Sequence, residues 1–318
     1  MPFITTSDLQ AFADKKVNLS TDEAKSGRDR VNFLRERLEK HFSENPGFSL
    51  VKMLHAGSVA KGTALSKVND MDVAVYVRAD DAPESGLVRW MAQRVRDAYG
   101  GTIDPSQVVE GANCPTIVFA SGLSVDVVPV LYEGEPDDRG CLVAKDTGDR
   151  LGTSVRLHLE FVRKRKMAHP HDFAQVVRFV KWWIREQKSL DDTFKFKSFI
   201  AELLVAKLAD DGVTLDDYGE ALTQVFNFIV ESQLRERIAF TDYYALGDLP
   251  GATGNAIEVF DPVNPENNVA FRYSSYDRDH IVSAAERALD AVTEASFATT
   301  KGEAVACWQV VLGTTFKG

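Results

Sequence analysis

The chain has 318 residues, of which 44% are hydrophobic and 26% charged. This composition is that of a folded protein with one large or two ordinary domains, and it excludes a chain that is disordered, collagenous or coiled-coil throughout. With 37 Lys and Arg against 47 Asp and Glu, the formal net charge is −10. That charge disfavours a general coat for DNA or RNA, but it permits a nucleotide-binding enzyme with a local cationic pocket.

The location of the protein and the redox state of its cysteines are predicted from the lack of three patterns: a membrane span, a secretory signal and paired cysteines. No apolar run approaches the roughly 18 residues that span a bilayer, and residues 1–16 lack the basic and then apolar pattern of a secretory signal. Cys114, Cys141 and Cys307 are far apart in the chain and form no Cys-x-x-Cys pair, so we expect reduced thiols rather than disulfides or a zinc site. The prediction is a cytoplasmic protein with no membrane association.

The first part of the chain predicts a helix followed by a sheet. Ser20, Thr21 and Glu23 form a helix-start signal. Apolar residues then recur at helical spacing: Val31, Leu34, Leu38 and Phe42. Short Val-rich stretches bounded by Gly, Pro, Asn and Asp predict strands at residues 50–56, 73–77, 116–120 and 123–130, with a helix at 86–99 between them.

After about residue 150 the hydrophobic pattern becomes helical. Apolar residues recur at helical spacing in residues 173–184, 200–208 and 281–292, while residues 239–268 are rich in Gly, Pro and Asn and predict loops. Because the strands come first and the helices later, we expect an α+β protein with two lobes. We place the sheet lobe, with the N-terminal helix, in residues 1–150 and the helical lobe in residues 151–318.

The stretch from residue 57 to residue 72 carries the first signal of chemistry. Gly57-Ser58 follows the first predicted strand, and after eleven more residues Asp70-Met71-Asp72 opens the next one. Residues i and i+2 of a strand share a face, so Asp70 and Asp72 project together and repel each other. A bound divalent cation relieves such repulsion, and Mg²⁺ prefers a few carboxylates together with phosphate oxygens and water.

A third carboxylate lies in the predicted strand 123–130. Asp126 is the only charge in that apolar strand, where a lone carboxylate is costly unless it is paired or bound to a metal. If this strand lies beside the strand of Asp70 and Asp72, the three carboxylates form one site. Two Mg²⁺ ions there, or Mn²⁺ in their place, would polarise an attacking hydroxyl and stabilise a leaving pyrophosphate. Asp126 would also help to deprotonate that hydroxyl.

Together these residues resemble the pattern of the polymerase-β-type nucleotidyltransferases. In that superfamily a Gly-Ser turn opens a helix whose amides and serine hydroxyl hold the triphosphate of the donor nucleotide, in agreement with the anion affinity of helix N-termini. The resemblance covers roughly residues 50–130 and implies the bilobal α+β fold of that superfamily. Its implied nucleotide-binding residues are Gly57 and Ser58, and its implied catalytic metal ligands are Asp70, Asp72 and Asp126.

Three segments of the helical half resemble oligoadenylate synthases and cGAS-like enzymes. Residues 176–183 resemble a lysine-bearing helix, residues 197–204 a segment with a phosphate-binding serine and a base-stacking aromatic, and residues 261–269 an Asp-Pro-x-x-Pro-x-x-Asn loop. With the catalytic pattern, they make the chain similar to the bacterial cGAS/DncV-like nucleotidyltransferases (CD-NTases), which make cyclic oligonucleotide signals in antiphage defence. This resemblance implies that Ser58, Lys181 and Ser198 bind the donor triphosphate and that Phe199 stacks on the donor base.

Basic residues of the helical half form two further features. Arg178, Lys181 and Arg185 recur at helical spacing and predict a cationic stripe opposite the apolar face of their helix. The basic run at residues 163–166 predicts a solvated helix face, with a nucleic-acid or partner contact as the alternative.

The resemblance implies a cyclic oligonucleotide synthase of CBASS antiphage signalling. Such an enzyme joins NTPs, ATP among them, through 2′–5′ or 3′–5′ phosphodiester bonds with release of pyrophosphate, and a downstream effector binds the product. The zinc-binding insertion and basic surface of animal cGAS are not evident, so we expect no duplex DNA or RNA activator. Gly318 would suit conjugation by a ubiquitin-transfer-like partner, and a frayed end is the alternative.

The sequence leaves other functions open. A template-independent RNA or tRNA nucleotidyltransferase keeps the fold but needs an extended basic cleft, which an acidic chain disfavours. A linear oligoadenylate synthase keeps the chemistry without the cyclisation. A non-catalytic nucleotide-binding protein is disfavoured by the intact aspartates. A transferase that adds AMP to a non-nucleotide acceptor also stays open, and a labelled acceptor in place of a labelled oligonucleotide would support it.

Overall fold

The computed structural model describes residues 2–45, 49–66, 70–78, 86–145 and 148–318. The chain divides into a sheet unit, Leu19–Glu160, and a helical unit made of Met1–Asn18 with Phe161–Gly318. Helix α5 (Val155–Ala168) contains the boundary between the two. No helix within the described residues is long and apolar enough to cross a bilayer.

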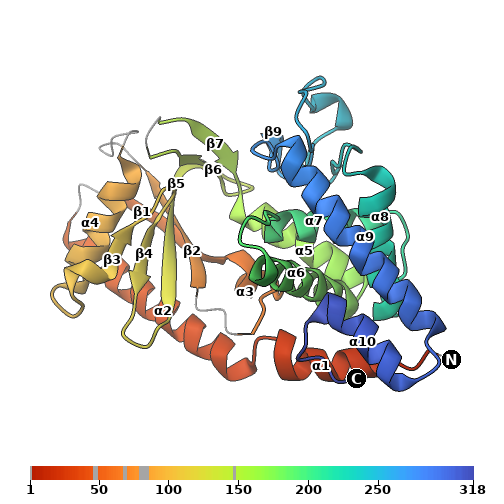
Figure 1. Cartoon of the computed structure of the whole chain (residues 1–318). Coiled ribbons are helices and arrows are strands. Elements are labelled where there is room, and N and C mark those ends of the chain that lie inside the picture. The colour runs from red at the N-terminus through yellow and green to blue at the C-terminus, as the bar shows by residue number, and fades with distance from the viewer. Residues whose placement is uncertain (1, 46–48, 67–69, 79–85, 146–147) are drawn as a thin grey trace. The chain divides into compact units, whose positions relative to one another are not determined.

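The described strands of the sheet unit form one mixed sheet of seven strands, ordered β1-β2-β5-β4-β3 with β6 and β7 continuing from β5 (Figure 1). Only β2 and β5 pair in parallel, and the other neighbours are antiparallel. The bounds are β1 (Ser49–Ala56), β2 (Asp70–Arg78), β3 (Val108–Glu110), β4 (Pro115–Val118), β5 (Ser124–Gly134), β6 (Arg139–Val143) and β7 (Arg150–Thr153). The strands predicted at residues 50–56, 73–77, 116–120 and 123–130 correspond to β1, β2, β4 and β5.

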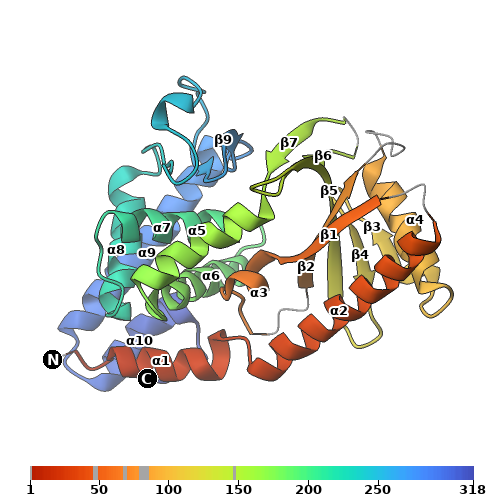
Figure 2. The ribbon, with the colours of Figure 1, turned by 180° about the vertical axis from the view of Figure 1, so that it is seen from behind.

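Helices α2 (Thr21–Glu44) and α4 (Leu87–Tyr99) cover one face of this sheet, and α2 runs along it (Figure 2). The predicted start signal is a capping box in which Ser20 and Glu23 bond each other's backbone amides. The apolar side chains predicted to line α2 are buried with the odd-numbered valines of β2 in one core. Ala74 and Tyr76 belong to a smaller cluster on the opposite face, which is therefore the face that Asp70 and Asp72 share.

The helical unit is built mainly from helices that follow residue 160. Their bounds are α6 (Asp172–Leu190), α7 (Ser198–Asp210), α8 (Tyr218–Ser232), α9 (Ser275–Phe297) and α10 (Lys301–Leu312). The helices predicted at residues 173–184, 200–208 and 281–292 lie within α6, α7 and α9. The segment predicted as loops is largely irregular but contains a small hairpin, β8 (Phe260–Asp261) with β9 (Asn264–Asn268).

Residues Met1–Asn18 belong to the helical unit by their contacts. Helix α1 (Thr6–Phe12) lies alongside α10 (Figure 1). The Phe12 ring packs edge-on against Trp182 at 5.6 Å and Phe316 at 5.2 Å, and Phe316 is fully buried. Packing of aromatic rings from segments far apart in the sequence therefore holds α1 against the rest of the helical unit. The division into functional lobes 1–150 and 151–318 stays a prediction.

Candidate active site

Strand pairing brings the three predicted aspartates onto one face of the sheet. In the parallel pair β2 and β5, Asp72 lies opposite Asp126 and Asp70 lies opposite Ser124. Paired residues of parallel strands point to the same side, and so do alternate residues along one strand. Asp70, Asp72 and Asp126 therefore project together from the face that α2 and α4 leave uncovered.

The Gly57-Ser58 turn contacts this carboxylate group directly. Helix α3 (Gly57–Lys61) begins at Gly57, immediately after β1. Gly57 has a φ of +64°, and a methyl group added to it would lie 1.7 Å from Asp72 Oδ2. Only glycine fits this backbone conformation and this approach, because any larger residue would displace the carboxylate. Ser58, the second residue of α3, is half-buried beside this contact.

Two hydroxyl groups and a thiol surround the aspartates. Thr116 Oγ1 donates a hydrogen bond to Asp126 Oδ1 at 2.5 Å, and Ser124 Oγ donates one to Asp70 Oδ1. The pKa of the Cys114 thiol is raised to about 12, first by burial and then by the negative charges of Asp126 and Asp72. The thiol of Cys114 therefore stays protonated beside the aspartates.

The donor set suits a hard divalent cation. Carboxylate oxygens are the ligands that Mg²⁺ prefers, and it usually keeps several waters or takes substrate phosphates as its remaining ligands. Within the described residues no three His, Cys, Asp or Glu side chains are gathered closely enough to enclose a metal on their own. A cation bound at these aspartates would therefore need further ligands from outside this group.

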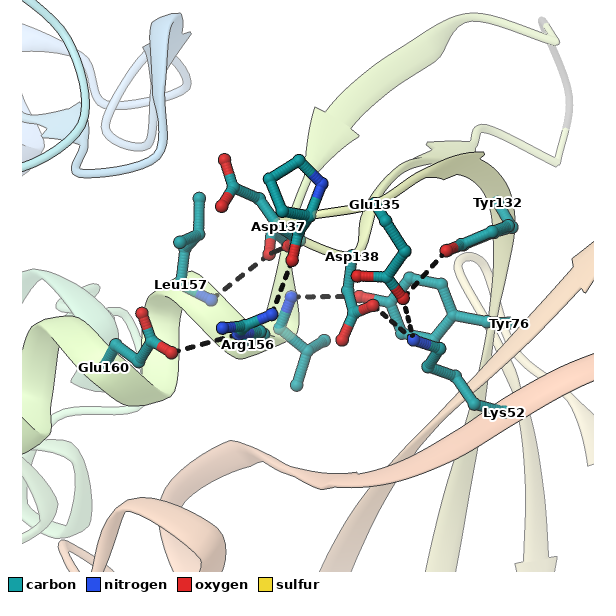
Figure 3. Close-up of polar contacts among 12 residues, drawn as sticks. Lys52, Tyr76, Tyr132, Glu135, Asp137, Asp138, Arg156, Leu157 and Glu160 are labelled. Atoms are coloured by element: carbon teal, nitrogen blue, oxygen red, sulfur yellow. Dashed lines mark hydrogen bonds and ion pairs between the residues drawn. The ribbon is translucent and has the colours of Figure 1, made fainter.

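A second polar cluster lies on the same sheet face, farther along β5 (Figure 3). Lys52 Nζ donates hydrogen bonds to Glu135 Oε1 at 2.8 Å and to Asp138, and these bonds raise the pKa of Lys52. Tyr132 donates its hydroxyl to the same Glu135 oxygen at 3.0 Å. The cluster fixes the turn between β5 and β6, so its role in the sheet unit is structural.

Lys181 is buried, contrary to the predicted cationic stripe. Only 6% of its side chain is exposed, and its Nζ lies 3.7 Å from Oε2 of Glu202, which is 2% exposed. The guanidinium of Arg185 stacks 3.6 Å from the ring centre of Trp182. The stripe was predicted because an amphipathic helix exposes one face to solvent. In the middle of α6, however, residues on nearly all sides of the helix are buried.

Glu202 is a charged partner that the sequence pattern did not single out. The sequence does contain a signal for Glu202, because this charged residue interrupts the apolar run that forms α7. Ser198 and Phe199 are the first two residues of that helix, and Ser198 is exposed while Phe199 is half-buried. Lys181, Ser198 and Phe199 thus lie in the helical unit, while Gly57, Ser58 and the aspartates lie in the sheet unit.

The loop resembling an Asp-Pro-x-x-Pro-x-x-Asn motif is held by its own polar side chains. Asp261 is buried and accepts hydrogen bonds from Val263 N at 2.9 Å and Asn267 Nδ2 at 3.0 Å. Asn268 Oδ1 accepts from two backbone amides, while its Nδ2 donates to Ile257 O at 2.9 Å. In this structure the motif residues stabilise the β8–β9 hairpin.

The basic run at residues 163–166 is not simply a solvated face. Arg165 is 5% exposed and pairs with Asp210 and with Asp242 Oδ2, the latter at 2.9 Å. Lys164 Nζ lies 2.9 Å from Asp242 Oδ1. The Arg165 guanidinium also stacks 3.6 Å from the Phe161 ring centre. Lys164 and Arg165 are thus used in ion pairs within the helical unit.

Comparison with known proteins gives matches over nearly the whole chain. Residues 3–144 match the Second Messenger Oligonucleotide or Dinucleotide Synthetase (SMODS) domain. The cyclic AMP-AMP-AMP synthase of Escherichia coli (strain MS 115-1) is 45% identical over 313 residues, which are 98% of this chain and 97% of the relative. Among solved structures, E. coli MS115-1 CdnC with ATP superposes with a TM-score of 0.92 at 44% identity, covering 99% of this chain and 100% of that one.

A structure of the same CdnC in complex with a HORMA protein matches equally well, with a TM-score of 0.92 and coverage of 99% of each chain. A more distant match is the Vibrio cholerae DncV cyclic AMP-GMP synthase with a linear intermediate. It has a TM-score of 0.70 at 13% identity over 96% of this chain and 93% of that one. At that identity the match concerns the fold alone.

Proposed function

Because the chain belongs to the cGAS/DncV-like nucleotidyltransferases (CD-NTases), we propose that its site joins three ATP molecules into a cyclic tri-adenylate, as the name of its 45% identical E. coli relative states for that enzyme. The predicted family, polymerase-β-like α+β fold and nucleotidyltransferase class are confirmed by these similarities. The chain is a cyclic oligonucleotide synthase of CBASS signalling. The adenine-only, three-nucleotide product is the proposed part.

The product is proposed from the name of the 45% identical relative, and the observation that supports the transfer chemistry is the row of carboxylates beside the Gly-Ser turn. Enzymes of this class use divalent metals, and we assign two Mg²⁺ ions, replaceable by Mn²⁺, to Asp70, Asp72 and Asp126. When bound, such ions supply charge that lowers the cost of the attacking oxyanion and of the leaving pyrophosphate. Asp126 is assigned to the acceptor side, where it orients the ribose hydroxyl and accepts its proton.

The remaining binding residues are assigned by their place in each unit. The backbone of Gly57 and Ser58 would hold the donor triphosphate, and the contact of Gly57 with Asp72 would set the phosphates beside the carboxylates. Lys181 and Ser198 are assigned to the same triphosphate and Phe199 to the donor base. Since Lys181 is ion-paired with Glu202, it would share its charge between that carboxylate and the phosphates.

Partners follow from the same similarity. ATP binding is supported by the ATP complex of the 44% identical CdnC, and a HORMA protein is a candidate partner because CdnC forms such a complex. Two calls stay predictions: that no duplex DNA or RNA activates the enzyme, and that a downstream effector binds its product. Conjugation through Gly318 also stays a prediction. Phe316 is fully buried, whereas Lys317 and Gly318 are exposed.

The test is incubation of the purified protein with four labelled NTPs and Mg²⁺, followed by phosphatase and mass spectrometry. We expect a phosphatase-resistant species of three adenylates. Asp70→Asn and Asp72→Asn should abolish it while leaving thermal unfolding unchanged. Asp29→Asn, at an exposed position on α2, is the matched control and should retain activity.

Other products would point to other functions. Phosphatase-sensitive oligomers would favour a linear oligoadenylate synthase, and extension of added RNA would favour a template-independent nucleotidyltransferase. Full activity of Asp72→Asn would contradict the assignment of the site.

A further inference from the structure

Two hydroxyl groups bind the carboxylates of the site from neighbouring backbone positions. Thr116 on β4 pairs across the sheet with Asp126 on β5, and its Oγ1 donates to Asp126 Oδ1 at 2.5 Å. Ser124 on β5 pairs with Asp70 on β2, and its Oγ donates to Asp70 Oδ1. Both hydroxyls therefore stand on the carboxylate face at places set by the strand register.

The register also connects one of these hydroxyls to the Gly-Ser turn. Thr116, Asp126, Asp72 and Ala56 are consecutive partners across β4, β5, β2 and β1. Gly57, which contacts the Asp72 carboxylate, follows Ala56 directly. The row thus begins with a hydroxyl donor and ends at the turn assigned to the triphosphate.

A hydroxyl that donates to one carboxylate oxygen fixes the orientation of the whole group. It engages one oxygen and leaves the second to face a cation. Threonine adds stiffness, because its branched Cβ restricts the first side-chain torsion. Ser124 is buried, so water competes little for its hydroxyl. Outer partners of this kind commonly tune metal sites, and their loss costs about 10- to 100-fold in metal affinity or activity.

We propose that Thr116 and Ser124 are positioning residues of the reaction, in that each fixes one carboxylate so that its second oxygen faces the metal. Thr116 acts on Asp126, at the acceptor side, and Ser124 acts on Asp70. This inference rests on the proposed function, since it takes the aspartates as metal ligands. Neither hydroxyl needs to touch a nucleotide.

Thr116→Val removes the hydroxyl and keeps the branched shape and the strand preference of the residue. We expect the Mg²⁺ concentration for half-maximal activity to rise about 10- to 100-fold, while the KM for ATP at saturating Mg²⁺ changes little. Thr116→Ser restores the donor and should return the Mg²⁺ requirement to within a few-fold of the wild type. Ser124→Ala should behave like Thr116→Val.

The matched control is Ser106→Ala. It removes a bond of the same kind, from Ser106 Oγ to Asp104 Oδ1 at 2.6 Å, in an exposed turn of the sheet unit. Its Mg²⁺ dependence should equal that of the wild type. A wild-type Mg²⁺ requirement in Thr116→Val would overturn the positioning role of Thr116. Equal losses in Thr116→Val and Thr116→Ser would overturn it too, since the hydroxyl would then not be the cause.

Direct Mn²⁺ binding, measured by electron paramagnetic resonance with a non-hydrolysable ATP analogue, separates this inference from the proposed function. If Asp72→Asn abolishes Mn²⁺ binding but the wild type makes no cyclic product, the proposed product is wrong, and the affinity of Thr116→Val still decides the positioning role. If Asp72→Asn binds Mn²⁺ like the wild type, the aspartates are not the metal site and both proposals fail.

Discussion

A methyl group at Gly57 is the smallest change that should disable this enzyme. The Cβ of Gly57→Ala would lie 1.7 Å from Asp72 Oδ2 and 2.4 Å from its Cγ, whereas real Cβ contacts essentially never fall below 3.0 Å. Either the Asp72 carboxylate or the Gly-Ser turn must therefore move by at least 1.3 Å, the difference between 3.0 and 1.7 Å. Both groups are assigned to the same metal and phosphates, so either movement separates them.

The expected magnitudes differ for catalysis and stability. A displacement of about 1 Å in a positioned group can cost about 100-fold in rate, so we expect Gly57→Ala to lose at least about 100-fold. The left-handed φ of +64° adds strain of about 1–2 kcal/mol for a residue with a Cβ. That strain should lower Tm by roughly 2–8 °C in a unit of this size. The variant should therefore fold and fail in catalysis.

Gly101→Ala is the control that separates strain from displacement. Gly101 has a φ of +79°, in the same sheet unit, but no atom lies within 4 Å of the place that an added methyl group would take. It should show a similar fall in Tm and wild-type product formation. The assay is the rate of cyclic product at saturating ATP and Mg²⁺, with thermal unfolding of each variant. Wild-type activity in Gly57→Ala, or equal losses in both variants, would refute the predicted contact between the turn and Asp72.

Three further predictions concern charged groups. Since burial and nearby carboxylates raise the pKa of Cys114 to about 12, iodoacetamide should label it slowly at pH 8, and Asp126→Asn should increase the labelling rate, as read by peptide mass spectrometry. Arg165→Met leaves Asp242 buried with less compensation and should cost about 3–5 kcal/mol in urea unfolding. Burial raises the pKa of Asp242, but hydrogen bonds from its basic partners lower it overall. The free-energy cost of Arg165→Met should therefore shrink as pH falls below about 4, where Asp242 becomes protonated and no longer needs the pair. Lys181→Met should raise the KM for ATP about 10-fold or more, because it removes the charge that we assign to the triphosphate.

Local patterns predicted the elements and the shared face of the carboxylates. Alternation along a strand places Asp70 and Asp72 on one side wherever that strand lies in the protein. A lone charge in an apolar strand also singled out Asp126 without any knowledge of its neighbours. These deductions need only short-range geometry, which explains their agreement with β2 and β5.

Contacts between distant segments were not predictable in the same way. The bond from Thr116 to Asp126 depends on the register of β4 against β5, and a shift by one residue would turn Thr116 to the other face. The burial of Lys181 depends on helices packing around α6 on nearly all sides. Phe12 joins the helical unit because its ring meets Trp182, from the middle of the chain, and Phe316, near its other end.

The open arrangement of the aspartates has a consequence for the order of events. Their carboxylates share one face but do not by themselves enclose an ion within the described part of the chain, so the free protein should bind Mg²⁺ weakly. Triphosphate oxygens would supply the missing ligands, so metal and nucleotide should bind cooperatively, each raising the affinity for the other by the same factor. The contact between Gly57 and Asp72 lies where the turn that we assign to the phosphates meets the aspartates that we assign to the metal. Under these assignments its geometry would set how strongly the two are coupled, and release of pyrophosphate would weaken metal binding at the end of each joining step.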